Sequence, residues 1–241
     1  MQSTPSKIVI IPYGAPTLDA QRVMVHANDD GSVTVECPTA FVTVGPEMLR
    51  LNGDQYTFPE TPDLRAMTDT AAQLDFLRNH LKQFCDLWAK PPKLFLDRYF
   101  EFVVAKVDEN EVRLRETLEQ FGSLYAYRDW SLSAPRPLPR AWLPLASGVF
   151  CPVDFAFWLG DRALAILLVG SGTATKKEMD RRRALEDAGI EIVELSARAL
   201  SHEGVDYLAR SLPVAFSAFW ESEVMPSSPF KGTALGDIVR Q

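Results

Sequence analysis

The 241-residue sequence predicts an α/β fold in which a β-rich module and a helical segment precede a core of strands and one charged helix. Three observations predict it. Residues 149–195 alternate between apolar, strand-like runs and one strongly charged run of helical character. Residues 71–88 carry apolar side chains at the spacing of an amphipathic helix. Residues 7–60 contain short β-branched runs separated by Asn, Asp, Gly and Pro, which is typical of a small antiparallel sheet.

The changes of pattern divide the chain into three segments. Residues 1–60 form the β-rich module, residues 61–121 the helical segment, and residues 122–241 the α/β core with its C-terminal helices. The first segment has five expected strands: 7–11, 23–27, 33–37, 41–44 and 55–58, the second and third of which form a hairpin.

Prolines and acidic residues set the expected helix limits. Pro91 and Pro92 are expected to separate helix 71–88 from a second helix over 93–121, which the acidic run 108–111 interrupts. Residues 122–147 hold four prolines and are expected to be irregular. Beyond the core, two further helices are expected, at 201–211 and 215–220.

The composition limits the classes of protein that fit. The net charge is −7, which argues against a globally basic, nucleic-acid-binding surface. Neither the three cysteines nor the three histidines have metal-ligand or disulfide spacing, so we expect no zinc site and a reducing compartment. The N-terminus lacks the apolar run of a signal peptide, and no run approaches the ~18 apolar residues of a membrane-spanning helix. We therefore expect a cytoplasmic protein that does not enter a membrane.

A hairpin and a capped helix define the core. Gly160-Asp161 is expected to be a two-residue turn, so that Leu159 faces Arg162 and Asp154 lies opposite Leu167. Val169 then shares a face with Leu167, because side chains alternate along a strand. The spacing T-x-x-E at 175–178 predicts a capping box that opens the charged helix.

This stretch resembles the core of the PD-(D/E)XK, or restriction-endonuclease-like, nuclease superfamily. Small members of that family read V-D-F, then E-V-D-G, then a basic helix, and residues 152–155 (P-V-D-F) match the first part. The resemblance covers residues 149–195 and implies a mixed sheet flanked by helices. It implies that Asp154 is the remnant of the metal-binding acid. Where the family carries its Glu and its Asp or Lys, this chain has Leu167 and Val169.

The missing acids decide what activity the resemblance implies. Nucleases of this type hold Mg²⁺, which requires oxygen ligands and activates a water for phosphodiester cleavage. Asp154 alone supplies one such ligand. We therefore expect a catalytically degenerate member that has no cofactor and that acts as a binding or scaffolding partner, with nucleic acid or a protein bound.

Two other functions remain open. The first is an active metal-dependent nuclease in which Mg²⁺ is held by Asp154 and by relocated groups, for which Glu101, Glu178 and Lys176 are the candidates. Glu101 lies among aromatic residues of the second helix, where a solvated position on the polar face is the simpler reading, and Glu178 already has a capping role. The second is an unrelated protein-interaction module with a similar order of strands and helix. The sequence specifies neither a substrate nor an oligomeric state.

Basic residues in two places are candidates for phosphate contact. Five lie on the charged helix: Lys176, Lys177, Arg181, Arg182 and Arg183. Arg136 and Arg140 lie in the proline-rich segment beside aromatic residues, a combination that suits single strands or splayed bases. Both groups also fit the simpler interpretation of solvated charges and of a segment that packs on the surface.

Overall fold

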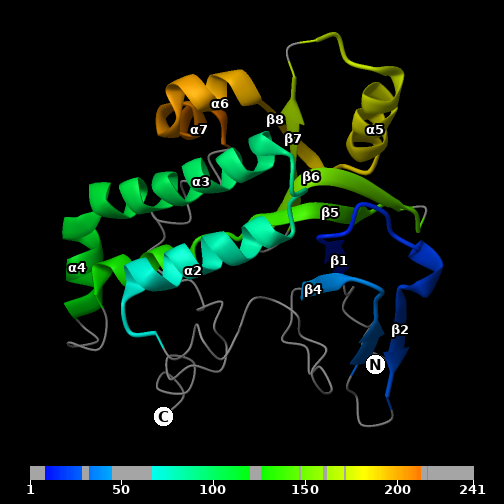
Figure 1. Cartoon of the computed structure of the whole chain (residues 1–241). Coiled ribbons are helices and arrows are strands. Elements are labelled where there is room, and N and C mark those ends of the chain that lie inside the picture. Colours follow the sequence, from blue (N-terminus) through cyan, green and yellow to red (C-terminus); the bar gives the residue numbers. More distant parts are fainter. Residues whose placement is uncertain are drawn as a thin grey trace.

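Figure 1 shows the fold, which is a computed structural model of the chain. The structure describes residues 9–28, 33–44, 67–119, 126–146, 148–159, 162–170, 172–212 and 216. The expected α/β class is confirmed, with a mixed four-stranded sheet among helices. No helix in these ranges is long and apolar enough to cross a membrane.

The central sheet runs in the order β5-β6-β7-β8. Its strands are β5 (Leu138–Pro144), β6 (Phe150–Trp158), β7 (Ala163–Val169) and β8 (Glu191–Ser196). The first three are antiparallel neighbours, whereas β8 is parallel to β7 and is reached through helix α5 (Lys176–Asp187). The sequence of β7, ALAILLV, is apolar on both faces because both faces of the sheet are covered.

Helices cover one face of the sheet (Figure 1). They are α2 (Thr70–Gln83), α3 (Lys90–Glu109), α6 (Ala197–Glu203) and α7 (Val205–Ser211), and α4 (Glu111–Glu119) follows α3 in the chain. Phe95 of α3 packs on Phe155 of β6 with ring centroids 4.4 Å apart. Tyr99 and Phe157 are part of the same buried cluster. Burying one such ring contributes about 1.5–3 kcal/mol, so the helical segment and the sheet stabilise each other through one core.

Helix α5 and the N-terminal strands cover the opposite face. Leu185 of α5 and Ile11 of β1 belong to the cluster that holds Leu167 of β7. Strand β1 (Val9–Tyr13) pairs with β4 (Ala40–Val44), and β2 (Met24–Ala27) pairs with β3 (Val33–Glu36) beyond the short 3-10 helix η1 (Ala20–Arg22). Both pairs are antiparallel, as expected, and the expected strand at 55–58 lies outside the described residues.

The helix limits differ from those expected, for identifiable reasons. α2 ends at Gln83, five positions before the expected end, and Phe84 forms its C-cap. Pro91 and Pro92 lie inside the first turn of α3. Proline is tolerated there because a backbone N–H in the first turn has no acceptor within the helix. The expected interruption is confirmed at Asn110, and Gly204, with a φ of 57°, divides the expected helix 201–211 into α6 and α7. Of the expected helix 215–220, only Phe216 is described.

The expectation that residues 122–147 are irregular is wrong for two parts of that segment. Tyr127–Ser133 form the 3-10 helix η4, and Leu138–Pro144 form β5. Proline is tolerated in β5 because that strand is at the edge of the four-stranded sheet, where not every N–H has a partner strand. Prolines alone therefore suggested a loop where an edge strand forms.

The expected hairpin register is confirmed between residues 155–159 and 162–166. Phe155 pairs with Ile166 and Trp158 with Ala163, and the Leu159 N–H donates to the Arg162 carbonyl at 2.9 Å. The pairing ends there, and the expected pair of Asp154 with Leu167, one step further along, is not among the paired residues. The two turn residues themselves lie outside the described residues.

Candidate functional site

The alternation of β5 and β6 changes phase beside Asp154. Val153 and Ala156 both join the cluster under α5, although residues three apart on a regular strand face opposite sides. The paired residues Pro139–Phe155 and Ala141–Val153 leave Arg140 next to Asp154, and Arg140 has a φ of 49°. Positive φ is uncommon for a residue other than glycine. The distortion lies where the sequence resemblance places the site.

The Asp154 carboxylate replaces a backbone acceptor in the sheet. The register of β6 and β7 would pair Leu168 with Val153, but the paired residues end at Phe155 and Ile166. Beyond that point the Leu168 N–H donates to Asp154 Oδ2 at 2.9 Å. Asp154 therefore completes the hydrogen bonding of β7 where β6 separates from it.

The surroundings of Asp154 disfavour its ionised form. Burial raises the pKa of the Asp154 carboxyl, and the nearby charge of Glu178 raises it further. The hydrogen bond from Leu168 and the charge of Arg181 act in the opposite direction. Arg181 Nη2 lies 3.9 Å from Asp154 Oδ2, and Leu167 is only 3% exposed.

Two carboxylates lie near the end of β7. Asp154 of β6 accepts from the Leu168 N–H, and Glu194 of β8 pairs with Leu167. Consecutive residues of α5 neutralise them, because Arg181 pairs with Asp154 and Arg182 pairs with Glu194.

Glu178 begins α5 as expected. Its carboxylate accepts from the Thr175 N–H at 2.7 Å and from the Thr175 hydroxyl at 2.8 Å. The Glu178 N–H in turn donates to Thr175 Oγ1 at 3.3 Å, so the capping box is confirmed. These hydrogen bonds from Thr175 lower the pKa of the Glu178 carboxyl. Glu178 also lines a cavity of about 70 Å³ with Leu167, Arg181, Arg182 and Glu194.

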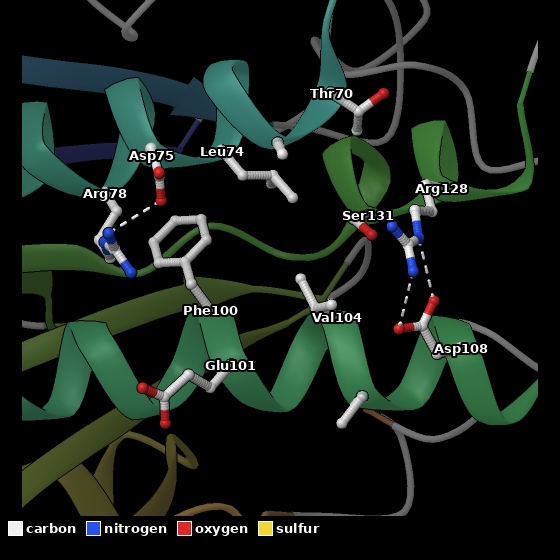
Figure 2. A pocket seen from close by; sticks show the side chains of 12 residues that line it. Thr70, Leu74, Asp75, Arg78, Phe100, Glu101, Val104, Asp108, Arg128 and Ser131 are labelled. Carbon is white, nitrogen blue, oxygen red and sulfur yellow. Dashed lines mark hydrogen bonds and ion pairs between the residues drawn. The ribbon is translucent and has the colours of Figure 1, made fainter.

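Glu101 lies elsewhere. Helix α3 covers the face of the sheet opposite α5, and Glu101 pairs with Arg98 of the same helix at 2.6 Å. Figure 2 shows Glu101 beside a groove of about 460 Å³ whose floor includes Leu74, Phe100 and Val104. The Asp75–Arg78 and Asp108–Arg128 pairs lie along the rim. The structure therefore does not bring Glu101 to Asp154.

The seven candidate phosphate-binding residues have different surroundings. Lys176, Lys177 and Arg183 are exposed on α5 and have no ion pair in the part of the chain that the structure describes. Arg181 and Arg182 form the pairs given above. Arg136 is 8% exposed and donates to the Leu132 carbonyl at 3.3 Å, so it does not lie where a phosphate could reach it. Arg140 is half-buried in β5.

Glu194 is the site residue that the sequence reasoning missed. The alternation of residues 190–195 predicts which face of the strand Glu194 occupies. Only the parallel register of β7 and β8 places Glu194 beside Leu167. That register depends on how α5 packs, which the strand pattern does not determine.

The donors at this site do not fit Mg²⁺. Among the described residues, no three His, Cys, Asp or Glu side chains gather. The Asp154 carboxylate already accepts a backbone N–H and faces a guanidinium, and Leu167 and Val169 offer no oxygen. Mg²⁺ needs oxygen donors in near-octahedral geometry.

No protein-family model, curated protein or solved structure matches this chain.

Proposed function

We propose that this chain is a catalytically degenerate PD-(D/E)XK-like protein that acts as a binding or scaffolding partner, with nucleic acid bound through α5. The arrangement around Leu167 carries the proposal. Asp154 accepts from the Leu168 N–H, Glu194 pairs with Leu167, and each carboxylate is paired with an arginine of α5. Each carboxylate therefore already has a cationic partner, which a metal ion would have to displace.

The charge distribution on α5 supports phosphate binding. Lys176, Lys177 and Arg183 are exposed, and no acidic partner neutralises them within the described residues. Lys176 and Lys177 open the helix, where the backbone dipole adds to their attraction for anions. Such contacts give weak, salt-dependent binding, which suits a scaffold better than a sequence-specific reader.

The experiment measures binding by fluorescence anisotropy. Labelled single-stranded DNA, duplex DNA and RNA are titrated at several salt concentrations with the wild type and a variant carrying Lys176→Gln, Lys177→Gln and Arg183→Gln. We expect the variant to bind more weakly and its salt dependence to fall by about 0.7–0.9 per lost contact. A control with the same change of charge carries Arg98→Gln, Lys106→Gln and Arg115→Gln on α3 and α4, and should bind as the wild type does. Failure of the wild type to bind any of the three at low salt would refute the nucleic-acid proposal.

An active nuclease with relocated ligands is the second candidate. It is favoured by the effect of Glu178 on Asp154, because a charge that raises the pKa of another carboxyl must lie near it. Lys176 is two positions away on the same helix. Metal-dependent cleavage that disappears in Asp154→Ala and Glu178→Ala would establish this alternative.

A protein-interaction module is the third candidate. The groove between α2, α3 and η4 favours it, because its apolar floor and internally paired rim suit uncharged side chains. If a protein partner binds in this groove, Val104→Glu should abolish its binding and leave any nucleic-acid binding unchanged.

A further inference from the structure

The turn between α2 and α3 holds two large apolar side chains in solvent. Leu87 is 78% exposed and Trp88 is 90% exposed. The backbone of this turn, residues 85–89, is nevertheless fixed by hydrogen bonds. Asp86 accepts from the Trp88 N–H at 2.9 Å through its side chain and from the Ala89 N–H at 3.2 Å through its carbonyl. The Lys93 amine donates to the Leu87 carbonyl at 2.7 Å.

A turn held in this way presents Trp88 at low entropic cost to a partner. Exposing an indole ring to water is unfavourable, since burial of such a ring contributes much of the binding energy at many interfaces. The hydrogen bonds hold the backbone that carries the ring, and the ring itself is 90% exposed. Trp88 is therefore placed as a contact residue and not as part of the core.

The electrostatic surroundings of the turn are positive in an acidic chain. Residues 82–93 contain three lysines and one aspartate, whereas the whole chain has a net charge of −7. Lys82 is tied to Asp97 at 2.6 Å. Lys90 and Lys93 have no ion pair among the described residues. Burial raises the pKa of the Cys85 thiol to about 11, and the charges of Lys93 and Arg140 act in the opposite direction. These two cations therefore lie near Cys85, at the start of the turn.

We propose that the Trp88 turn binds single-stranded nucleic acid, with the Trp88 ring stacked on a base and Lys90 and Lys93 beside the phosphates. The inference rests on the proposed function. It adds a second nucleic-acid contact surface, separate from the one on α5. An exposed aromatic ring among cations is the combination that holds single strands without sequence preference. Duplex DNA keeps its bases stacked on each other, so the ring favours single strands.

A lipid surface is the occupant that the turn fits less well. Stable membrane attachment takes a long apolar face or two separate anchors. Leu87 and Trp88 are only two side chains, and the helices on either side bury their apolar faces in the protein core.

The test compares four variants in anisotropy titrations with a single-stranded homopolymer, a fully abasic strand of equal length and the matching duplex. Trp88→Phe keeps an aromatic face, Trp88→Leu keeps apolar area without one, Leu87→Ala removes the neighbouring apolar chain, and Lys90→Gln removes one cation. We expect Trp88→Leu to weaken binding of the homopolymer about tenfold, with Trp88→Phe and Leu87→Ala near the wild type. Binding of the abasic strand should not respond to Trp88→Leu. Lys90→Gln should reduce the salt dependence on both strands.

The outcomes separate this inference from the proposed function. Base stacking would be overturned if Trp88→Leu and Leu87→Ala weakened binding of the homopolymer equally. It would also be overturned if Trp88→Leu weakened binding of the abasic strand as much as that of the homopolymer. If all turn variants bind normally and the α5 variant does not, the turn inference fails while the proposed function stands. Lack of any nucleic-acid binding by the wild type would refute both. Co-sedimentation of the wild type, but not Trp88→Leu, with vesicles of anionic lipid in the absence of nucleic-acid binding would assign the turn to a membrane.

Discussion

Replacing Asp154 tests whether its carboxylate is a structural hydrogen-bond acceptor. Asp154→Ala leaves the Leu168 N–H, now bonded at 2.9 Å, without an acceptor at a partly buried position. An unsatisfied buried donor costs about 1–3 kcal/mol. For a chain of this size each kcal/mol corresponds to about 2–4 °C in Tm. Asp154→Ala should therefore lower Tm by about 2–12 °C. Asp154→Asn retains an oxygen acceptor, loses the pair with Arg181 at 3.9 Å and removes a charge that burial disfavours, so its Tm should be no lower than that of the wild type.

The measurement is thermal unfolding followed by circular dichroism at pH 7. Asp180→Ala is the matched control, since Asp180 is an exposed acid on α5. We expect Asp154→Ala to have the lowest Tm, the control to match the wild type, and Asp154→Asn to have a Tm no lower than that of the wild type. If Asp154→Asn loses as much stability as Asp154→Ala, the charge and not the hydrogen bond is what matters, and the reasoning is wrong.

Two further predictions concern the same surface. Leu167→Glu should destabilise the protein by about 3–5 kcal/mol, because it buries an unpaired charge at a position that is 3% exposed; an unchanged thermal midpoint would mean that the position is open to solvent. The pH dependence of stability should show two opposite contributions. The raised pKa of Asp154 gives stability that is complete below its usual value of 3.8 and is lost as pH rises through the folded value, so Asp154→Asn should remove this loss. The lowered pKa of Glu178 gives stability that is present above its usual value of 4.5 and is lost as pH falls through the folded value, so urea titrations of Glu178→Gln should lack that acid-side decrease.

Local patterns predicted a large part of the core. Alternating residues on both sides of Gly160-Asp161 were enough for the β6–β7 register, because a one-residue slip would reverse the face of every side chain. Thr175 and Glu178 were enough for the start of α5, because a capping box depends only on residues three apart.

The remaining features depend on tertiary packing. Pro139 and Pro144 suggested a loop, and only the position of β5 at the sheet edge makes a strand possible. Arg136 carries the same charge as the exposed cations of α5, yet its side chain is buried and donates to the Leu132 carbonyl. The pairing of Arg182 with Glu194 requires both the crossover of α5 and the parallel register. Trp88 follows a helix with a regular apolar stripe, so its exposure could not be read from the spacing.

A nuclease assay tests the central claim of a degenerate site most directly. Purified wild type is incubated with single-stranded DNA, duplex DNA and RNA in Mg²⁺ or Mn²⁺, beside Asp154→Ala, Glu101→Ala and Glu178→Ala. We predict that no substrate is cleaved above the level that the Asp154→Ala variant gives, since the Asp154 carboxylate already accepts from Leu168 and faces Arg181, and Leu167 and Val169 supply no oxygen ligand. Metal-dependent cleavage by the wild type that is lost in Asp154→Ala would contradict the account, and whichever Glu variant also loses it would identify the relocated ligand.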